Sequence, residues 1–98
     1  MRPCSRIEIV VEEAMVKHMA QCLEEAGAEG YTLIPRASGS GDRGPRRGDD
    51  PTGMSTNCVF IVASPDDSTT ERIVEAVRPL LSRSGGVCLV SEARWVKH

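Results

Sequence analysis

The sequence predicts an α+β fold whose elements follow the order βαββαβ. This prediction rests on the hydrophobic period, which is two residues in the predicted strands and about 3.6 in two predicted helices. A chain of 98 residues supports one core, so we expect a single domain over residues 1–98. Two βαβ-type units in so short a chain are typical of a ferredoxin-like sandwich, an antiparallel sheet with both helices on one face.

The N-terminal part of the chain predicts the first strand and the first helix. Residues 6–12 alternate, with three β-branched side chains on one face, which is a strand pattern. From Glu13 the apolar residues follow helical spacing instead, in the stripe Met15, Met19, Cys22, Leu23 and Ala26. Gly27 suits the position just beyond a helix, where glycine tolerates a positive φ.

A long polar segment separates the second and third predicted strands, which are residues 30–35 and 56–63. This segment, residues 36–55, holds five Gly, two Pro and four Arg. Loops beyond about 12–15 residues are uncommon in compact domains and are usually functional or disordered. Arginine forks bind phosphate and other small oxyanions, and glycines let backbone N–H groups approach an anion. We therefore expect a mobile loop that becomes ordered on a small anionic ligand or a partner.

The C-terminal part predicts a second helix and a last strand. Residues 65–68 (Pro-Asp-Asp-Ser) are typical of a turn and an N-cap, and apolar residues at helical spacing follow. Pro79 is expected to kink or end this helix, because proline lacks the N–H that a helix interior needs. After the turn at residues 82–86, residues 87–96 predict the last strand.

The third predicted strand is apolar on both faces, with Val59, Ile61 and Ala63 alternating with their equally apolar neighbours. Continuous apolar runs are typical of strands that are buried on both sides. Two helices cover only one face of such a sheet, and a bare second face would exceed a tolerable apolar patch. The sequence therefore predicts an oligomer in which another copy of the chain covers the second face.

Composition excludes several classes of function and site. A net charge of −2 gives no bulk attraction for nucleic acid or for an anionic membrane, and the longest apolar run, residues 58–63, is far too short to span one. The four cysteines have no metal-ligand spacing, so we expect reduced, mostly buried thiols and no metal site. The N-terminus fits no signal peptide, and a cytoplasmic protein is expected.

Other functions of ferredoxin-like domains fit the residues less well. An RNA-recognition domain needs stacking aromatics on its central strands, and a metal carrier needs paired thiols after the first strand. An acylphosphatase needs a glycine-rich phosphate loop between the first strand and the first helix, where this chain has Glu12 and Glu13. His18 on a polar helix face and His98 form no nucleophile–base pair, so we expect no enzyme.

Three segments resemble the PII signalling superfamily. They are Gly-Ala-Glu-Gly-Tyr-Thr-Leu at residues 27–33 followed by the long Arg/Gly loop, Asp66-Asp67 before the second helix, and Gly85-Gly86 before the last strand. Within the superfamily the sequence is most similar to short PII-like proteins of inorganic-carbon uptake, including carboxysome-associated ones. The resemblance implies a homotrimer with adenine nucleotides in three lateral clefts and a target-binding T-loop at about residues 36–55.

The resemblance also implies which residues contact the nucleotide. The adenine and ribose would be lined from the second and third strands by Gly30, Tyr31, Thr32, Phe60 and Val62. The phosphates would lie against the loop root and the last turn, at Ser38, Gly39, Ser40, Gly41, Gly85, Gly86 and Val87. Positive charge would come from the loop and the C-terminus, through Arg43, Arg46 and Lys97.

Departures from classical PII proteins refine this expectation. Residues 82–86 replace a longer phosphate-binding loop, which implies that ADP or AMP binds at least as well as ATP. Residues 36–55 hold no tyrosine, so a uridylylation switch is absent. The sequence holds no acidic cluster that would indicate binding of 2-oxoglutarate with magnesium.

The expected function is that of a non-enzymatic sensor of adenine nucleotide, with bicarbonate as a second ligand and no covalent cofactor. Its T-loop would signal inorganic-carbon or energy status to a protein target, with a bicarbonate transporter as the candidate implied by the resemblance. Two alternatives stay open. One is a trimeric interaction module without nucleotide binding, like the divalent-cation-tolerance proteins, and the other is a small acylphosphatase-like hydrolase.

Overall fold

The computed structural model describes residues 1–38, 40–41, 44–45 and 56–98. In chain order the strands and helices are β1 (Arg2–Glu12), η1 (Glu13–Met15), α1 (Val16–Glu25), β2 (Thr32–Ala37), β3 (Ser40–Gly41), β4 (Gly44–Pro45), β5 (Asn57–Ser64), α2 (Asp67–Ser84) and β6 (Val87–Trp95). Leaving aside the two-residue strands β3 and β4, which pair with each other, this is the predicted order βαββαβ. The ferredoxin-like prediction is confirmed.

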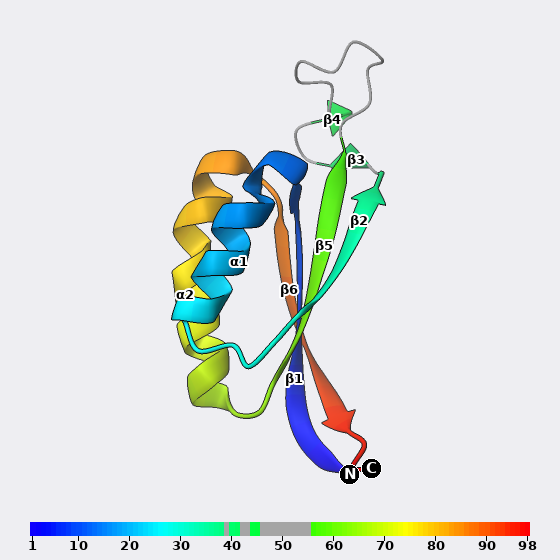
Figure 1. Cartoon of the computed structure of the whole chain (residues 1–98), viewed down its shortest axis with the longest axis vertical. Coiled ribbons are helices and arrows are strands. Elements are labelled where there is room, and N and C mark those ends of the chain that lie inside the picture. Colours follow the sequence, from blue (N-terminus) through cyan, green and yellow to red (C-terminus); the bar gives the residue numbers. More distant parts are fainter. Residues whose placement is uncertain (39, 42–43, 46–55) are drawn as a thin grey trace.

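A four-stranded antiparallel sheet in the order β2-β5-β1-β6 forms the centre of the fold. Both helices pack on one face of it, and the two termini meet at the end of the sheet opposite to β3 and β4 (Figure 1). We call the end with the termini the lower end and the other the upper end, as they are drawn there. The strands β2 and β6 form the two edges.

The hydrophobic core lies between the sheet and the helices. Alternate residues of β1 point into it, and their partners on β5 do the same: Ile7 is paired with Val62 and Ile9 with Phe60. The core is completed from both helices and from the same face of β1, by Val11, Met19, Leu23, Ile73 and Val77. These side chains are fully buried, as the alternating and helical patterns predicted for β1 and for both helices.

The helix predicted from Glu13 begins with a 3-10 turn, and the α-helical part starts only at Val16. Its end agrees with the prediction, because Gly27 follows the C-cap residue and has a φ of 98°. The carbonyl of Ala26 accepts a hydrogen bond from Nε of Arg72, which lies on α2, at 3.3 Å. The second helix thus helps to satisfy the C-terminal end of the first.

Asp66 is the N-cap of α2, within the segment 65–68 where a turn and an N-cap were predicted, and its side chain accepts a hydrogen bond from the backbone N–H of Thr69 at 2.7 Å. Pro79 neither ends nor divides this helix, which continues to Ser84 as one element, and the expectation of a helix end at this position was wrong. Pro79 is exposed, so the carbonyl that loses its intrahelical donor lies on a side that water reaches.

Strand β1 begins at Arg2, four residues before its predicted start. The added residues pair with the end of β6, with Arg2 opposite Trp95 and Cys4 opposite Ala93. The four cysteines are free, as predicted, although only Cys58 is buried and the other three are partly exposed.

The sheet face away from the helices carries a row of apolar side chains across all four strands. The register aligns Ile34, Val59, Val10 and Val87 in this row. Ile34 and Val87 are each nearly half exposed, and Leu89 in the next row is 56% exposed. We call this surface the open face. It is the uncovered apolar face that the sequence predicted.

Candidate functional site

The root of the predicted T-loop lies at the upper end of the sheet, where Ala37 of β2 pairs with Asn57 of β5. The β2–β5 register shifts between Ile34 and Ala37, and Arg36 within this irregularity has a φ of 57°, the only positive value among the described non-glycine residues. A left-handed conformation is uncommon for such a residue and marks local strain. Beside it, a hollow of about 590 Å³ is lined by Lys17, Arg36 and residues of η1, β2 and β5.

The turn at Gly85 and Gly86 lies at the same upper end, because Val87 pairs with Val10 near the end of β1. Gly85 is buried, and its N–H donates to the carbonyl of Leu81 at 2.8 Å, so this donor is already engaged in closing α2. Gly86 has a φ of 126°, and a Cβ there would lie 2.5 Å from the carbonyl oxygen of Val10.

Asn57 is a residue of the loop root that the sequence reasoning missed. It is 5% exposed, and its Oδ1 is the one buried side-chain polar atom in the described part of the chain without a hydrogen-bond partner. A buried acceptor without a donor costs free energy, so a donor from a ligand or a second copy would stabilise the structure. The available signal was a lone amide at the start of an otherwise apolar strand, directly after the loop.

The segment predicted to line adenine and ribose lies lower on the edge strand β2. Thr32 pairs with Ile61, five residues before Ala37, so it lies about 16 Å from the loop root along the strand. Tyr31 is 40% exposed, and its ring packs edge-on against Phe60 with the centroids 5.1 Å apart. Thr32 is exposed, and the register places it on the open face beside Ile61.

Phe60 and Val62 do not form a wall for a base. Both side chains are 0% exposed and belong to the core under the helices, so the prediction that they flank an adenine ring is wrong. The side chains of β5 on the open face are instead those of Val59, Ile61 and Ala63. Both faces of β5 are apolar, so its own sequence does not indicate which face packs in the core. Glu8 and Glu12 on the paired strand β1 do indicate it, because they point away from the core.

Lys97 lies at the lower end, beyond the last residue of β6. Eight residue steps of about 3.3 Å separate Val87 from Trp95, so the two ends of β6 are about 26 Å apart. Within one chain, the structure thus separates Lys97 from Ser38, Gly85, Gly86 and Val87, which lie together at the upper end. Gly39, Arg43 and Arg46 lie outside the described residues, and Ser40 and Gly41 are described as strand β3 only.

The geometry and the sequence point to the same family. The sequence model of the family described as Nitrogen regulatory protein P-II matches residues 4–98. The chain belongs to this PII family. It is therefore a PII-like regulatory protein.

Solved structures of PII-like proteins share this fold. CPII from Thiomonas intermedia, bound to ADP, AMP and bicarbonate, is 25% identical, with a TM-score of 0.81 over 98% of this chain and 96% of that chain. The same protein bound to ADP and bicarbonate is 26% identical, with a TM-score of 0.80 over 95% and 88%. A proposed PII-like signalling protein from Thermus thermophilus shares the fold at 23% identity and a TM-score of 0.72, over 97% and 91%.

Two further observations concern the described residues. They contain no group of three or more His, Cys, Asp or Glu residues arranged to hold a metal ion. Neither α1 nor α2, nor any other helix in this part of the PII-family chain, is long and apolar enough to cross a membrane.

Proposed function

We propose that this PII-family chain is a non-enzymatic sensor that binds ADP or AMP in clefts between the subunits of a homotrimer. The observation that carries this proposal is the separation of the predicted contacts. Ser38, Gly86 and Val87 lie at the upper end of the sheet, and Lys97 lies at the lower end. A nucleotide is too short to bridge the length of β6, so only a second copy can bring both groups to one ligand.

The open face supports the assembly. Its apolar row ends in Ile34 on one edge strand and Val87 on the other, and both are nearly half exposed. Burial of apolar surface contributes about 25 cal/mol per Å², so covering this row favours association. A threefold arrangement would turn three such faces toward one axis and leave three lateral clefts between neighbouring sheets.

In each cleft the ligand contacts would come from three segments. Gly30, Tyr31 and Thr32 are proposed at the adenine and ribose, where the ring of Tyr31 packs against Phe60 but stays 40% exposed. The phosphates would lie at the loop root and at Gly86 and Val87. Lys97 would reach them from the neighbouring subunit, and Arg43 and Arg46 remain proposed as further cations.

Bicarbonate is proposed as the second ligand near the loop root. The support is that CPII of Thiomonas intermedia, 25% identical, is bound to ADP, AMP and bicarbonate. The Oδ1 of Asn57, which has no hydrogen-bond partner, lies at this root. Bicarbonate has one O–H group, which could donate a hydrogen bond to this oxygen. Ligand binding would then select one arrangement of the T-loop, residues 36–55, by its differential affinity for that arrangement.

The proposed output is the binding of a protein target by the T-loop, with inorganic-carbon or energy status as the signal. A bicarbonate transporter is the target class proposed, and a link to carboxysomes is part of the same proposal. We propose a cytoplasmic location, which fits the four free cysteines.

Calorimetric titration with ADP, AMP and ATP, each with and without bicarbonate, tests the proposal. We expect about one nucleotide per chain, with ADP or AMP at least as tight as ATP, and tighter binding when bicarbonate is present. Lys97→Gln should weaken the binding of ADP, whereas Arg78→Gln, which removes an exposed cation paired with Glu75 on α2, should not. No heat with any nucleotide would contradict the sensor and favour the interaction module, and release of phosphate from a nucleotide or from acetyl phosphate would favour the hydrolase.

A further inference from the structure

We propose that the lower end of strands β1 and β6 is a phosphate-binding site in which Arg2 is the principal cation and Trp95 holds it in place. The chemical class of the ligand is a diphosphate, either the diphosphate of a bound nucleotide or a free one. For a nucleotide the inference rests on the proposed function and deepens it, because it names Arg2 as the residue that favours ADP over AMP. For a free diphosphate it stands without that function.

The two strands project beyond the rest of the sheet at this end. The β1–β5 ladder stops at Ser5, whereas the β1–β6 ladder continues to Arg2 and Trp95. We call residues 2–4 and 93–95 the ribbon. Its position leaves one side of Arg2 and Trp95 without a neighbouring strand, so both side chains are accessible, and Trp95 is 39% exposed.

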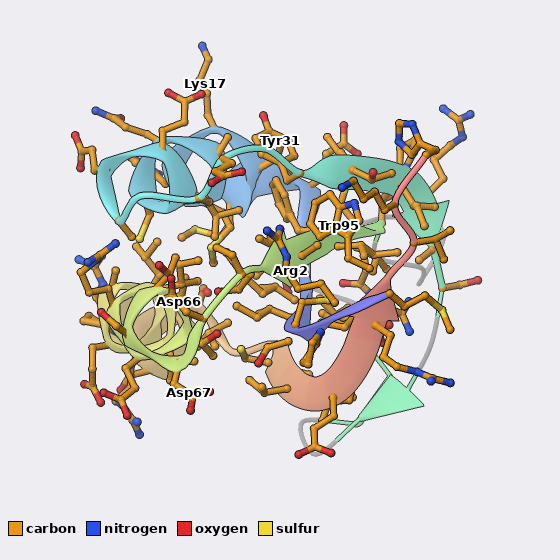
Figure 2. All side chains as sticks on the ribbon, turned by 90° about the horizontal axis from the view of Figure 1, so that it is seen from below. Arg2, Lys17, Tyr31, Asp66, Asp67 and Trp95 are labelled. Atoms are coloured by element: carbon orange, nitrogen blue, oxygen red, sulfur yellow. The ribbon has the colours of Figure 1, made fainter. Side chains whose placement is uncertain are left out.

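Arg2 is held against the indole ring, with Cζ 6.0 Å from the ring centroid. A guanidinium over an aromatic face keeps its charge and its N–H donors while losing conformational freedom. Figure 2, which looks onto the lower end, shows the two side chains close together. An arginine ordered in this way loses less entropy when its fork binds two oxygens of a phosphate.

The charges around the ribbon divide into two sides. A hollow of about 420 Å³ is lined by Arg2, Trp95, Val96, Lys97 and His98, so its lining holds two permanent cations and no acidic side chain. A second hollow of about 690 Å³ lies toward α2 and includes Asp66, Asp67 and Glu92 in its lining. In Figure 2 these two aspartates lie well apart from Arg2 and Trp95. Electrostatics therefore favour an anion in the first hollow only.

Two other cations near the ribbon have different surroundings. Arg6 forms an ion pair with Glu8 at 3.2 Å, and Arg94 lines the hollow that contains the aspartates as well as a further hollow with Trp95 and Val96. Among the described residues, no ion pair is formed by Arg2 or Lys97. These two cations are therefore available to a ligand of matching charge.

Register places this hollow beside the surface that a second copy would cover. Arg2 and Trp95 face each other across the ladder, and even-numbered residues of β1 and odd-numbered residues of β6 point to the open face. The family match covers residues 4–98, so Arg2 lies just outside the matched region. A second subunit docked on the open face would thus bring its own ligand close to Arg2.

The chemistry favours a diphosphate over a larger polyanion. The hollow has room for a compact group, and the net charge of −2 repels an extended nucleic acid. Arg2 supplies a planar fork and Lys97 a point charge, which together match the two phosphates of ADP or of pyrophosphate. AMP offers only one phosphate, so its affinity should fall less than that of ADP when the side chain of Arg2 is removed.

The test uses the full chain and three probes, ADP, AMP and inorganic pyrophosphate. Trp95 is the only tryptophan, so its fluorescence reports binding directly. Arg2→Gln should weaken the binding of ADP and of pyrophosphate about tenfold or more, and the binding of AMP by less than about threefold. The melting temperature should not change. Arg78→Gln is the matched control, because Arg78 is exposed on α2 and pairs with Glu75. By calorimetry, Trp95→Leu should imitate Arg2→Gln, and Trp95→Phe should retain most of the affinity.

Each outcome separates the two proposals. Equal ADP and pyrophosphate affinities in the wild type, Arg2→Gln and Trp95→Leu would overturn the ribbon site and leave the nucleotide sensor intact. Binding of pyrophosphate that depends on Arg2, without binding of any nucleotide, would support the ribbon site and overturn the sensor. If AMP alone binds the wild type, the ribbon site is overturned and the sensor stands, and if none of ADP, AMP and pyrophosphate binds, both proposals fall.

Discussion

The Nε of Arg72 donates to the carbonyl oxygen of Ala26 at 3.3 Å, so a side chain from the second helix closes the end of the first. The same guanidinium lies above Gly27, where a Cβ would be 3.0 Å from Nη2. One contact thus links the cap of α1, the position of α2 and the absence of a side chain at residue 27. In the PII family chain described here, this corner leads directly into the segment proposed to bind adenine.

Arg72 and Gly27 are predicted to be energetically coupled. Gly27→Ala should cost about 1–2 kcal/mol, because φ is 98° and the new methyl displaces the guanidinium. Arg72→Ala should cost about 0.5–1.5 kcal/mol through the lost hydrogen bond. In the double variant the displacement no longer matters, so its total cost should be smaller than the sum. Urea unfolding of the four proteins measures the coupling, and strict additivity would contradict it.

Gly86 is predicted to be the glycine least tolerant of substitution among those with a described environment. Its φ is 126°, and a Cβ would lie 2.5 Å from the backbone oxygen of Val10, which cannot move aside as a side chain can. Gly86→Ala should lower stability by more than about 2 kcal/mol, equivalent to a fall in Tm of about 8 °C or more. Gly30→Ala is the control, because nothing lies within 4 Å of its Cβ, and it should change stability by less than about 0.5 kcal/mol.

Asp66 is predicted to make stability depend on acid pH. The backbone N–H of Thr69 is the main cause that lowers the pKa of this carboxyl below its ordinary value. A lowered folded pKa gives stability that is present above the unfolded value of about 3.9 and is lost as pH falls through the folded value. The Tm difference between the wild type and Asp66→Ala should therefore be constant from pH 6 to 8 (about two units above that value and higher) and shrink below about pH 4.

Asp66→Asn provides the control for this titration. Asparagine keeps an acceptor at the N-cap but does not ionise, so its difference from Asp66→Ala should stay constant across the same pH range. A Tm difference between the wild type and Asp66→Ala that persists undiminished at pH 2 would contradict the role of the charge. Differential scanning calorimetry measures both series.

The elements of this fold could be predicted from local patterns, but its site could not. Alternation in β1, the stripe of α1, Gly27 and Asp66 were each correct because a period or a cap is a short-range property. The role predicted for Phe60 needs a side chain that faces a ligand, and the sequence could not orient this side chain, because two apolar faces leave the orientation of β5 to its pairing with β1. That pairing joins residues about fifty positions apart, and no local pattern encodes it.

The ribbon and the unpaired amide oxygen of Asn57 could not be predicted for the same reason, because both depend on pairing between strands that are distant in the sequence. Residues 2–5 contain a proline and little alternation, so pairing with β6 rather than local propensity makes them a strand. Asn57 is an ordinary polar residue in the sequence, and only its burial between β2 and β1 makes it a candidate. Residues predicted to contact one ligand can also lie far apart in one chain: Val87 begins β6, Lys97 lies beyond its last residue, and the two ends of this strand are about 26 Å apart.

The open face is predicted to hold the trimer together, and Leu89 tests it. Its side chain is 56% exposed on that face, and a carboxylate there would be buried against another copy without a partner. Leu89→Glu should convert a trimer to monomers in sedimentation velocity, with loss of nucleotide binding because each cleft needs two subunits. Val90→Glu is the matched control, since Val90 is 49% exposed on the same strand but on the opposite face. A wild type that sediments as a monomer, or a Leu89→Glu variant that stays trimeric, would contradict the assembly proposed here.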